Sequence, residues 1–354
     1  MTPVAPATAG SAGTPRDPKI VALGGGHGLY ATLTAMRYLS ADITAVVTVA
    51  DDGGSSGRLR AELGLIPPGD LRMALAALMC APKALEDFQV AGDPATRRRH
   101  ELWAEVLQHR FGGRGALAGH PIGNLLLAGL TEVLGDTVGA LGELREMFGI
   151  EGQVLPMSTV PLDIEADVSG LEADPRISRE IRGQVAVATT PGKVRRVRLS
   201  PHDPPACETA LEAIESADLV MLGPGSWFSS VIPHVLVPEQ LKALQRSAAR
   251  KILVVNLAPE PGETPGFSVE RHLHVLHAHA DTFRVDHVLV DASSVPAGRE
   301  RDHLVRAAGL FGAQLDVGDV AVPGRQVHDP AKVAAVVNEL CEGELTRYSG
   351  RADA

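Results

Sequence analysis

The sequence has few cysteines and no long apolar run. Its three cysteines, Cys80, Cys207 and Cys341, are far apart in the chain, and none forms a pair at metal-ligand spacing. This usage is typical of a protein kept in a reducing cytoplasm. No apolar stretch reaches the roughly 18 residues that a spanning helix needs, so we expect no membrane span. Residues 1–18 have neither the basic start nor the apolar stretch of a secretory leader, and we expect a disordered N-terminal tail there.

Positive charge and aromatic side chains are also scarce. The chain has 33 Lys and Arg against 43 Asp and Glu, a formal net charge of −10, and only 3% aromatic residues. A nucleic-acid binder normally carries the opposite sign, because neutralising phosphates supplies most of its non-specific affinity. Single-strand binders also need aromatic rings on which bases stack. We therefore expect no nucleic-acid partner, and any bound phosphate must be held locally.

The remaining composition is that of a folded protein. Hydrophobic residues make up 45% and charged residues 21% of the 354 positions. At about 150 residues per domain, this length predicts two domains, or one large α/β unit that carries an insertion. An apolar run over 19–23 enters Gly24–Gly28 and a helical pattern over 29–39, and a second strand pattern follows over 43–49. Two parallel strands joined by a helix are the expected result.

The middle of the chain has a different sequence pattern. Between about 152 and 200 the sequence shows short β-like runs, such as Gln184–Thr189 and Val194–Leu199, and predicts a small β-rich insertion. Three further strands are expected at Leu219–Leu222, Ile252–Leu257 and Val288–Val290. The fold class is therefore α/β, a Rossmann-like and mostly parallel sheet with helices on both faces. It forms a single domain over 19–343, with a polar C-terminal tail over 344–354.

The first candidate site is the glycine turn Gly24–Gly28. It follows a strand and opens a helix, so its amides could hold an anion at the helix N-terminus. The Rossmann spacing is not met, because its third glycine falls on Leu29, and the turn has no Walker Lys. The competing interpretation is tight packing between strand and helix.

The second candidate is the run from Asp51 to Arg58. Two adjacent acids at a strand end repel each other unless a cation or donors compensate, which suggests Mg²⁺ or ligand hydroxyls at Asp51 and Asp52. The glycines and serines beside them could cradle phosphate, and Arg58 could add a charge-assisted contact. A solvated turn is the alternative. Further along, Asp70 is placed to cap a helix over 71–79.

The second half of the chain repeats the strand, glycine and helix pattern at Gly223-Pro-Gly-Ser226. Ligand contact and a plain helix cap by Ser226 both fit this segment. A serine-hydrolase elbow does not fit, because Phe228 stands where its second glycine would be. Asn256 follows a strand and suits a base or a sugar hydroxyl, although a turn explains it equally well. Four histidines at 272, 274, 277 and 279 spread around a helix, which does not favour a metal site.

Together these motifs resemble those of the gluconeogenesis-factor (YvcK) family within the CofD-like superfamily. The resemblance runs from about Lys19 to Glu342. It is carried by Leu23–Leu29, Val49–Leu59, Pro67–Arg72, Gly119–Leu125, Gly223–Ser226 and Pro261–Thr264. It implies a Rossmann-like fold related to 2-phospho-L-lactate transferase. For the gluconeogenesis-factor branch it implies UDP-sugar binding in the cytoplasm and a regulatory role in cell shape and cell-wall synthesis on gluconeogenic carbon sources.

The resemblance implies a UDP-sugar partner, such as UDP-N-acetylglucosamine or UDP-glucose, with a homo-oligomer and cell-wall regulatory proteins as further partners. Many relatives have Thr at the position of His27, and often Gln at the position of Glu260. Because the Glu260 carboxylate would repel phosphate, we expect its side chain to point away from the phosphate. The alternatives are a CofD-like transferase that uses Mg²⁺ and, with less support, a dehydrogenase. The candidate ligand-binding residues are Gly25, Gly26, His27, Gly28, Asp51, Asp52, Gly53, Gly54, Ser55, Ser56, Arg58, Gly69, Asp70, Asn124, Gly223, Pro224, Gly225, Ser226, Asn256, Glu263 and Thr264.

Overall fold

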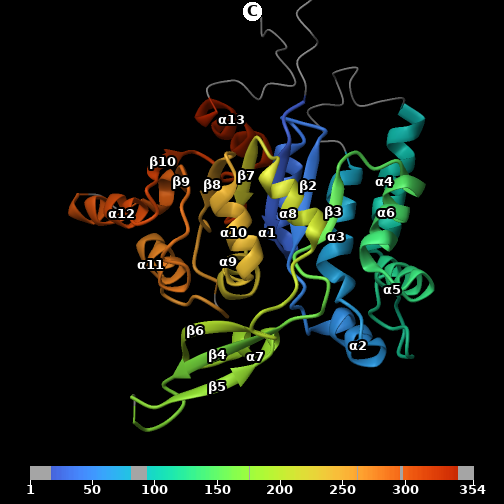
Figure 1. The fold of residues 1–354 in the computed structure, drawn as a ribbon, viewed down its shortest axis with the longest axis horizontal. Helices are drawn as coiled ribbons and strands as arrows, with labels where there is room; N and C mark the ends of the chain where they lie inside the picture. Colours follow the sequence, from blue (N-terminus) through green and yellow to red (C-terminus); the bar gives the residue numbers. More distant parts are fainter. Residues whose placement is uncertain (1–16, 81–93, 175, 261, 296–297, 342–354) are drawn as a thin grey trace, which may run out of the picture.

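The large sheet of the protein is parallel throughout. The computed structural model describes residues 17–80, 94–174, 176–260, 262–295 and 298–341. Its seven strands are ordered β10-β9-β8-β7-β1-β2-β3 (Figure 1). They are β1 (Ile20–Gly24), β2 (Ile43–Val47), β3 (Gln153–Pro156), β7 (Leu219–Leu222), β8 (Arg250–Val254), β9 (His287–Asp291) and β10 (Gln314–Gly318). The tails expected over 1–18 and 344–354 lie outside the described residues, apart from positions 17 and 18.

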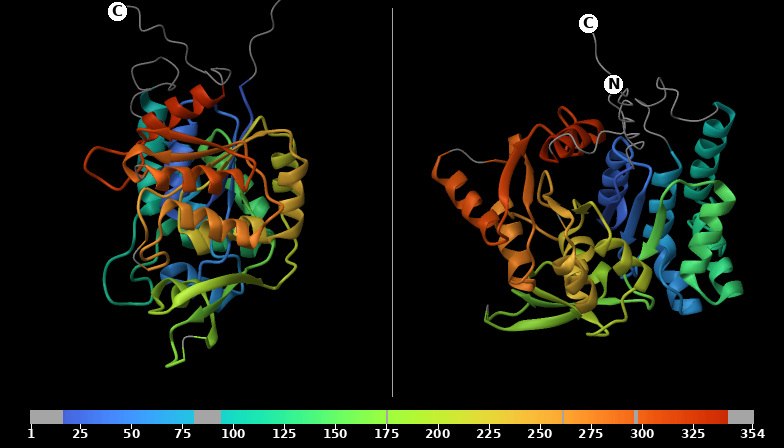
Figure 2. Two further views of the ribbon diagram at one scale, coloured as in Figure 1. Left: turned by 90° about the vertical axis from the view of Figure 1, so that its left-hand side faces the viewer. Right: turned by 45° about the horizontal axis from the view of Figure 1, so that its top comes forward.

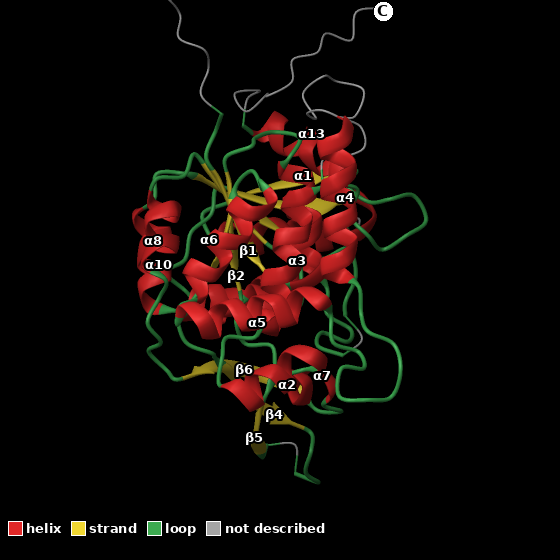
Figure 3. Ribbon diagram, turned by 90° about the vertical axis from the view of Figure 1, so that its right-hand side faces the viewer, coloured by secondary structure: helices red, strands yellow, loops and turns green. Residues whose placement is uncertain are grey.

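Helices cover both faces of this sheet, as expected for the fold class. Helices α1, α3 and α13 pack together on one face, and α8 and α10 lie on the other (Figures 1 and 3). The helices are α1 (Gly26–Met36), α2 (Gly54–Leu63), α3 (Pro68–Met79), α4 (Pro94–Gln108), α5 (Ile122–Leu134), α6 (Thr137–Phe148), α7 (Gln184–Thr189), α8 (Glu208–Glu215), α9 (Pro233–Leu236), α10 (Pro238–Arg246), α11 (Val269–His279), α12 (Arg299–Gly309) and α13 (Pro330–Leu340). Two further helical segments are the π-helix η2 (Trp227–Val231) and the 3₁₀-helix η3 (Ala292–Ser294). No helix among the described residues is long and apolar enough to cross a membrane.

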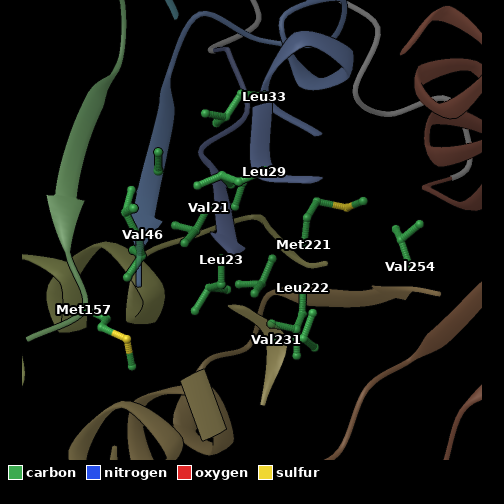
Figure 4. Packing of buried hydrophobic residues seen from close by; sticks show 14 of the residues in the cluster. Val21, Leu23, Leu29, Leu33, Val46, Met157, Met221, Leu222, Val231 and Val254 are labelled. Carbon is green, nitrogen blue, oxygen red and sulfur yellow. The ribbon is translucent and has the colours of Figure 1, made fainter. Parts of the chain in front are cut away.

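The core forms because the central strands are apolar on both faces. Every residue of β1, β2 and β7 is buried, which is the pattern of a parallel sheet covered by helices. Leu23 of β1, Val46 of β2 and Leu222 of β7 lie close together beneath Leu29 of α1 (Figure 4). This packing fixes the strand ends from which the candidate loops leave.

The predicted insertion contains a separate small sheet. Strands β4 (Asp163–Ser169), β5 (Ser178–Arg182) and β6 (Lys193–Ser200) pair antiparallel in the order β5-β4-β6. This sheet lies beyond the carboxyl ends of the large sheet's strands (Figures 1 and 2). The stretch 153–156 inside the expected insertion belongs instead to the large sheet, because β3 pairs with β2.

The strand predicted over Gln184–Thr189 is wrong, because these residues form helix α7. Gly183 has a φ of 100°, which ends β5 and turns the chain. The carboxylate of Asp52 then accepts a hydrogen bond from the Val185 amide at 2.9 Å, so the first turn of α7 is capped from another part of the chain. A six-residue Val and Ala run carries no periodicity that could reveal this.

The connectivity creates a switch point between β1 and β7. The chain builds β1, β2 and β3 toward one edge, returns to the other side of β1 with β7, and then adds β8, β9 and β10 outward. The loops after β1 and β7 therefore leave the sheet in opposite directions. Ligands of open α/β sheets bind in the crevice at such a point, beyond the carboxyl ends of the strands.

A buried histidine holds the end of β1 in place. His234 of α9 is fully buried, and its Nε2 lies 3.2 Å from the carbonyl oxygen of Gly24, while its Nδ1 lies 2.9 Å from the Gln240 amide nitrogen. These partners assign the proton to Nε2, which donates to Gly24, while Nδ1 accepts from Gln240. Burial lowers the pKa of His234 to about 4, so the ring is neutral at neutral pH.

We expect His234→Asn to change the acid sensitivity of the fold. The pKa of His234 falls from about 6.5 in the unfolded chain to about 4 in the folded one, so its contribution is present above pH 6.5 and is lost as pH falls toward 4. Between pH 7 and pH 5 the free energy of unfolding of the wild type should fall by about 2 kcal/mol more than that of the variant. Urea titrations at both pH values measure this difference. The exposed His274→Asn serves as control, and equal acid dependence in wild type and His234→Asn would contradict the assignment.

Candidate functional site

The two glycine loops touch each other through their backbones. A Cβ added at Gly28 would lie 2.1 Å from the carbonyl oxygen of Pro224 and 2.7 Å from the Cα of Gly225. A Cβ at Gly25 would lie 2.4 Å from the Cγ2 of Thr48 and 2.6 Å from the Oδ2 of Asp70. Tight packing is therefore a structural reason for Gly25 and Gly28. It does not compete with ligand binding, because close backbone approach is also what exposes loop amides to an anion.

The sequence had suggested that Asp70 caps its own helix, and the structure shows that it does not. Helix α3 begins after Pro67 without a side-chain cap, because Pro67, and not Asp70, occupies the N-cap position. The carboxylate of Asp70 instead accepts a hydrogen bond from the amide of Gly26, at the start of α1. Asp70 thus stabilises the glycine turn after β1 from a neighbouring helix.

The second loop is held by side chains from the segment after β8. The Oδ1 of Asn256 accepts from the Gly225 amide at 2.9 Å, and its Nδ2 donates to the Gly225 carbonyl at 2.8 Å. Both ends of this amide are therefore bonded to backbone, and Asn256 positions the loop. A direct contact of Asn256 with a base or sugar stays a prediction.

Ser226 does not provide the helix cap that was one interpretation of this loop. Its hydroxyl donates to the Oε1 of Glu260 at 3.3 Å, and the turn η2 is capped by Glu263. The Glu263 carboxylate accepts from the Phe228 amide at 2.9 Å and from the Ser229 hydroxyl at 2.5 Å. Burial raises the pKa of Glu263. Thr264, fully buried, accepts from the Glu260 amide at 2.9 Å, so the Glu263-Thr264 motif builds the loop from beneath.

A groove lies between the two glycine loops, at the switch point. Its volume is about 290 Å³, and its lining includes His27, Gly28, Gly225, Glu260 and His328. The carboxylate of Glu260 accepts from the Ser226 hydroxyl and its amide donates to Thr264, which places Glu260 at this groove; that it points away from a bound phosphate stays a prediction. Burial, together with the nearby Glu263, raises the pKa of Glu260 to about 7. Its negative charge is thus reduced near neutral pH.

On the β2 side the two adjacent acids have different surroundings. Asp51 is partly buried, accepts from the Gly53 amide at 2.9 Å and from the Ser56 hydroxyl, and has a pKa raised by burial. Asp52 faces the small sheet and bonds to Val185. Burial and the Asp51 charge raise the pKa of Asp70 to about 7, and the Asp52 charge adds to the raised pKa of Asp51. Asp51 therefore interacts with both acids, and the Mg²⁺ role suggested for Asp51 and Asp52 stays a prediction.

The glycines of this region serve the same packing. A Cβ at Gly69 would lie 2.3 Å from the Oγ of Ser56 and 3.2 Å from the Oδ2 of Asp51. Gly54 has a φ of 51°, and Gly53 is the N-cap of α2. The run that was expected to be a phosphate-cradling loop therefore becomes the first turn of α2 from Gly54 onward, and its amides point along that helix.

A buried polar chain continues from this acid pair. The Ser55 hydroxyl lies 2.8 Å from the Nδ1 of His120 and accepts from the Nδ2 of Asn124 at 3.1 Å. The Oδ1 of Asn124 is buried and has no partner among the described residues. Arg58 is exposed and donates to the Ala118 carbonyl at 3.0 Å. Its contact with a ligand stays a prediction.

Sequence reasoning missed two residues of this cluster, Arg72 and His120. Both belong to motifs that were quoted for the resemblance, but their burial could not be foreseen from spacing. Arg72 is 4% exposed, its Nε has no partner among the described residues, and burial lowers its pKa to about 10. Burial also lowers the pKa of His120, and the nearby Arg58 adds to this shift. An arginine and two acids thus share one polar cluster, which suits a ligand with both hydroxyl and anionic groups.

Comparisons with known proteins give the family. The family model for 2-phospho-L-lactate transferase CofD matches residues 20–328. The chain is 64% identical over 326 residues to a Mycobacterium tuberculosis (strain H37Rv) protein provisionally named gluconeogenesis factor, covering 92% of this chain and 91% of that one. It is 32% identical over 339 residues to the gluconeogenesis factor of Bacillus subtilis (strain 168), covering 92% and 98%.

A solved structure agrees with these sequence matches. The crystal structure of a UPF0052-family protein from Bacillus halodurans superposes with a TM-score of 0.76 at 32% identity, covering 91% of this chain and 99% of that chain. With the two touching glycine loops at the switch point, these matches show that the chain belongs to the CofD family and, within it, to the gluconeogenesis factors.

Proposed function

We propose that the protein binds a nucleotide sugar, a UDP-sugar such as UDP-N-acetylglucosamine or UDP-glucose, at the carboxyl edge of its large sheet. The observation that carries this proposal is the contact between the two glycine loops at the switch point. Gly28 and Gly225 bring two backbone turns together beside one groove, and the first turn of α1 begins there. A diphosphate is the group that such backbone amides hold best.

The charge of the protein supports a local phosphate site. A chain of net charge −10 repels a polyanion at long range, so affinity must come from short hydrogen bonds. Backbone amides at a helix start provide these without a surface of basic residues. The polar cluster of Asp51, Asp70 and Asn124 lies on the β2 side of the same edge and suits the hydroxyls of a sugar.

We infer a regulatory role for this binding, in the cytoplasm and in the control of cell shape and cell-wall synthesis on gluconeogenic carbon sources. This part of the proposal rests on the family resemblance, as do a homo-oligomer and cell-wall regulatory partners. The aromatic content of 3% favours binding over transfer to a planar acceptor, because few rings are available for stacking.

UDP-N-acetylglucosamine should raise the melting temperature of the protein, because a ligand that binds only the folded state stabilises it by mass action. NAD should have much less effect. Gly28→Ala should weaken binding at least about tenfold, because its Cβ would lie 2.1 Å from the Pro224 carbonyl oxygen and force the loops apart. Isothermal titration measures the affinity of each variant.

Gly129→Ala is the matched control for that experiment. A Cβ at Gly129 in α5 meets no atom within 4 Å, so this variant should fold and bind as the wild type does. Circular dichroism at the titration temperature verifies that Gly28→Ala remains folded. Stabilisation by NAD with none by any uridine nucleotide would refute the proposed ligand class.

A CofD-like transferase that uses Mg²⁺ is the second candidate, and the partly buried acids Asp51 and Asp70 favour it. Burial raises the pKa of both, and the Asp51 charge adds to the shift of Asp70. A divalent cation would relieve this repulsion, and Mg²⁺ is commonly held by one or two carboxylates together with substrate phosphates. The residues therefore fit the ion, with Asp51 and Asp70 as its holders. The ion would supply charge neutralisation of phosphate oxygens.

We expect Asp70→Asn to reveal this pair through pH. The pKa of Asp70 rises from about 4 in the unfolded chain to about 7 in the folded one, so its contribution to stability is full below pH 4 and is lost as pH rises through 7. From pH 5 to pH 8 the free energy of unfolding of the wild type should therefore fall by up to about 3 kcal/mol relative to the variant. Mg²⁺ at pH 8 should restore stability in the wild type only. Asp281→Asn, an exposed change, is the control, and parallel pH curves for wild type and Asp70→Asn would contradict the pairing.

A further inference from the structure

A second and larger cavity opens beside the groove, beyond the carboxyl ends of β8 and β9. Its volume is about 700 Å³, and it lies between α11, η3, α12 and the segment near Arg325. The colours of Figure 2 show these segments gathered at the β9 and β10 side of the sheet. Five residues line both spaces, so the cavity continues the groove: Asn256, Leu257, Ala258, Pro259 and Gln326. A ligand whose phosphates lie at the glycine loops therefore reaches this cavity with one of its ends.

The charges of the cavity wall favour a neutral occupant. Glu270 and Glu300 line it, and Arg325 is the one arginine among its lining residues. Two carboxylates offset the guanidinium, so a phosphate would gain little there. The end of the ligand that enters this cavity is therefore its uncharged end, either the sugar or the base.

The chemistry of the wall distinguishes these two. Phe267, Leu257 and Leu304 supply apolar surface. The hydroxyls of the wall are already used within the chain, because Ser293 donates to Asp291 at 2.5 Å and Ser294 donates to the Leu257 carbonyl at 2.8 Å. Sugar hydroxyls placed against this apolar part of the wall would lack partners, and a buried polar group without a partner is unfavourable. A flat base with few polar atoms fits better.

One buried polar atom in this wall lacks a partner. His272 is 2% exposed, and its Nδ1 lies 2.8 Å from the Ser268 carbonyl, to which it must donate. Its Nε2 is therefore an acceptor, and it has no hydrogen-bond partner among the described residues. The ring is held edge-on by Trp227 and Phe267, whose centroids lie 5.0 and 5.3 Å away, so it cannot readily turn. A buried acceptor in a fixed ring selects a ligand that brings a donor.

We propose that this cavity receives the nucleobase of the bound nucleotide, and that the Nε2 of His272 accepts the ring N–H of a uracil-type base. The inference rests on the proposed function and adds to it the position and the selection of the base. Uracil has an N–H at N3, whereas cytosine has the same size but an acceptor at N3. The phosphates then lie at the glycine loops, and the sugar extends toward Asp51 and Asp70.

The test compares UDP with CDP. In a Trp103→Phe variant, Trp227 is the single tryptophan and lies against His272, so its emission reports on the cavity. We expect UDP to change this emission and CDP to bind at least about tenfold more weakly, because an acceptor would face an acceptor. N3-methyl-UDP, which lacks the N–H, should be weakened in the same way on the wild-type protein.

Two Ala→Leu variants, one in the cavity wall and one as a control, test the position of the base independently of His272. Ala321→Leu adds bulk to the cavity wall without removing a hydrogen bond of that side chain, and it should weaken UDP at least about tenfold. Ala278→Leu, on the exposed side of α11, should bind as the wild type does. Equal affinities for UDP and CDP would overturn the base assignment. Unchanged Trp227 emission on UDP binding, together with undiminished UDP affinity of Ala321→Leu, would overturn it as well. Neither result would contradict the nucleotide-sugar proposal. Absence of binding by every uridine nucleotide would overturn both.

Discussion

The arrangement of the site depends on one backbone contact, that of Gly28 with Pro224 and Gly225. These residues come from loops almost 200 positions apart in the chain, and they meet only because β1 and β7 are neighbours in the sheet. Because no side chain larger than hydrogen fits at Gly28, the two loops can be adjacent, and the groove lies beside their contact. His234 fixes the end of one strand, and Asn256 fixes the loop after the other. The contact between the two loops is thus made of backbone, and side chains of neighbouring segments hold it in place.

The buried acids on the two sides of this contact have different tasks. On the β8 side, Glu263 caps η2, and Asp291 accepts from the amides of Ser293, Val320 and Ala321. Each of these carboxylates is satisfied by donors of the chain itself. On the β2 side, Asp51 accepts from Gly53 and Ser56 and Asp70 accepts from Gly26, but burial outweighs these hydrogen bonds and raises the pKa of both acids.

Much of the fold could be predicted from sequence, because apolar runs and glycine turns are local signals. The strand Leu219–Leu222 was predicted at its observed bounds, and the glycine turn after β1 does open a helix. The predictions that failed concern residues whose hydrogen-bond partners are distant in the sequence. Gln184–Thr189 is helical because Asp52, over 130 residues earlier, caps it. Asp70 does not cap its own helix, because its carboxylate accepts from the Gly26 amide of another helix. His272 was seen only as one member of a histidine-rich helix, since nothing in the spacing shows that Ser268 takes one nitrogen and leaves the other bare.

Ion pairs and hydrogen bonds join the small sheet to the segment from Asp52 to α2. Asp163 of β4 pairs with Arg60 of α2 and with Arg182 of β5, at 2.5 Å each, and Arg60 also donates to the Leu162 carbonyl at 2.8 Å. Asp52 adds the bond to α7. Since α2 begins two residues after Asp52, the turn at Asp51 leads directly into the helix that contacts the small sheet. The Arg60–Asp163 pair is partly buried, and breaking it would leave a charge without its partner, so it holds α2 and the small sheet together. The Asp163 network thus connects α2, at the carboxyl edge of the large sheet, with the small sheet.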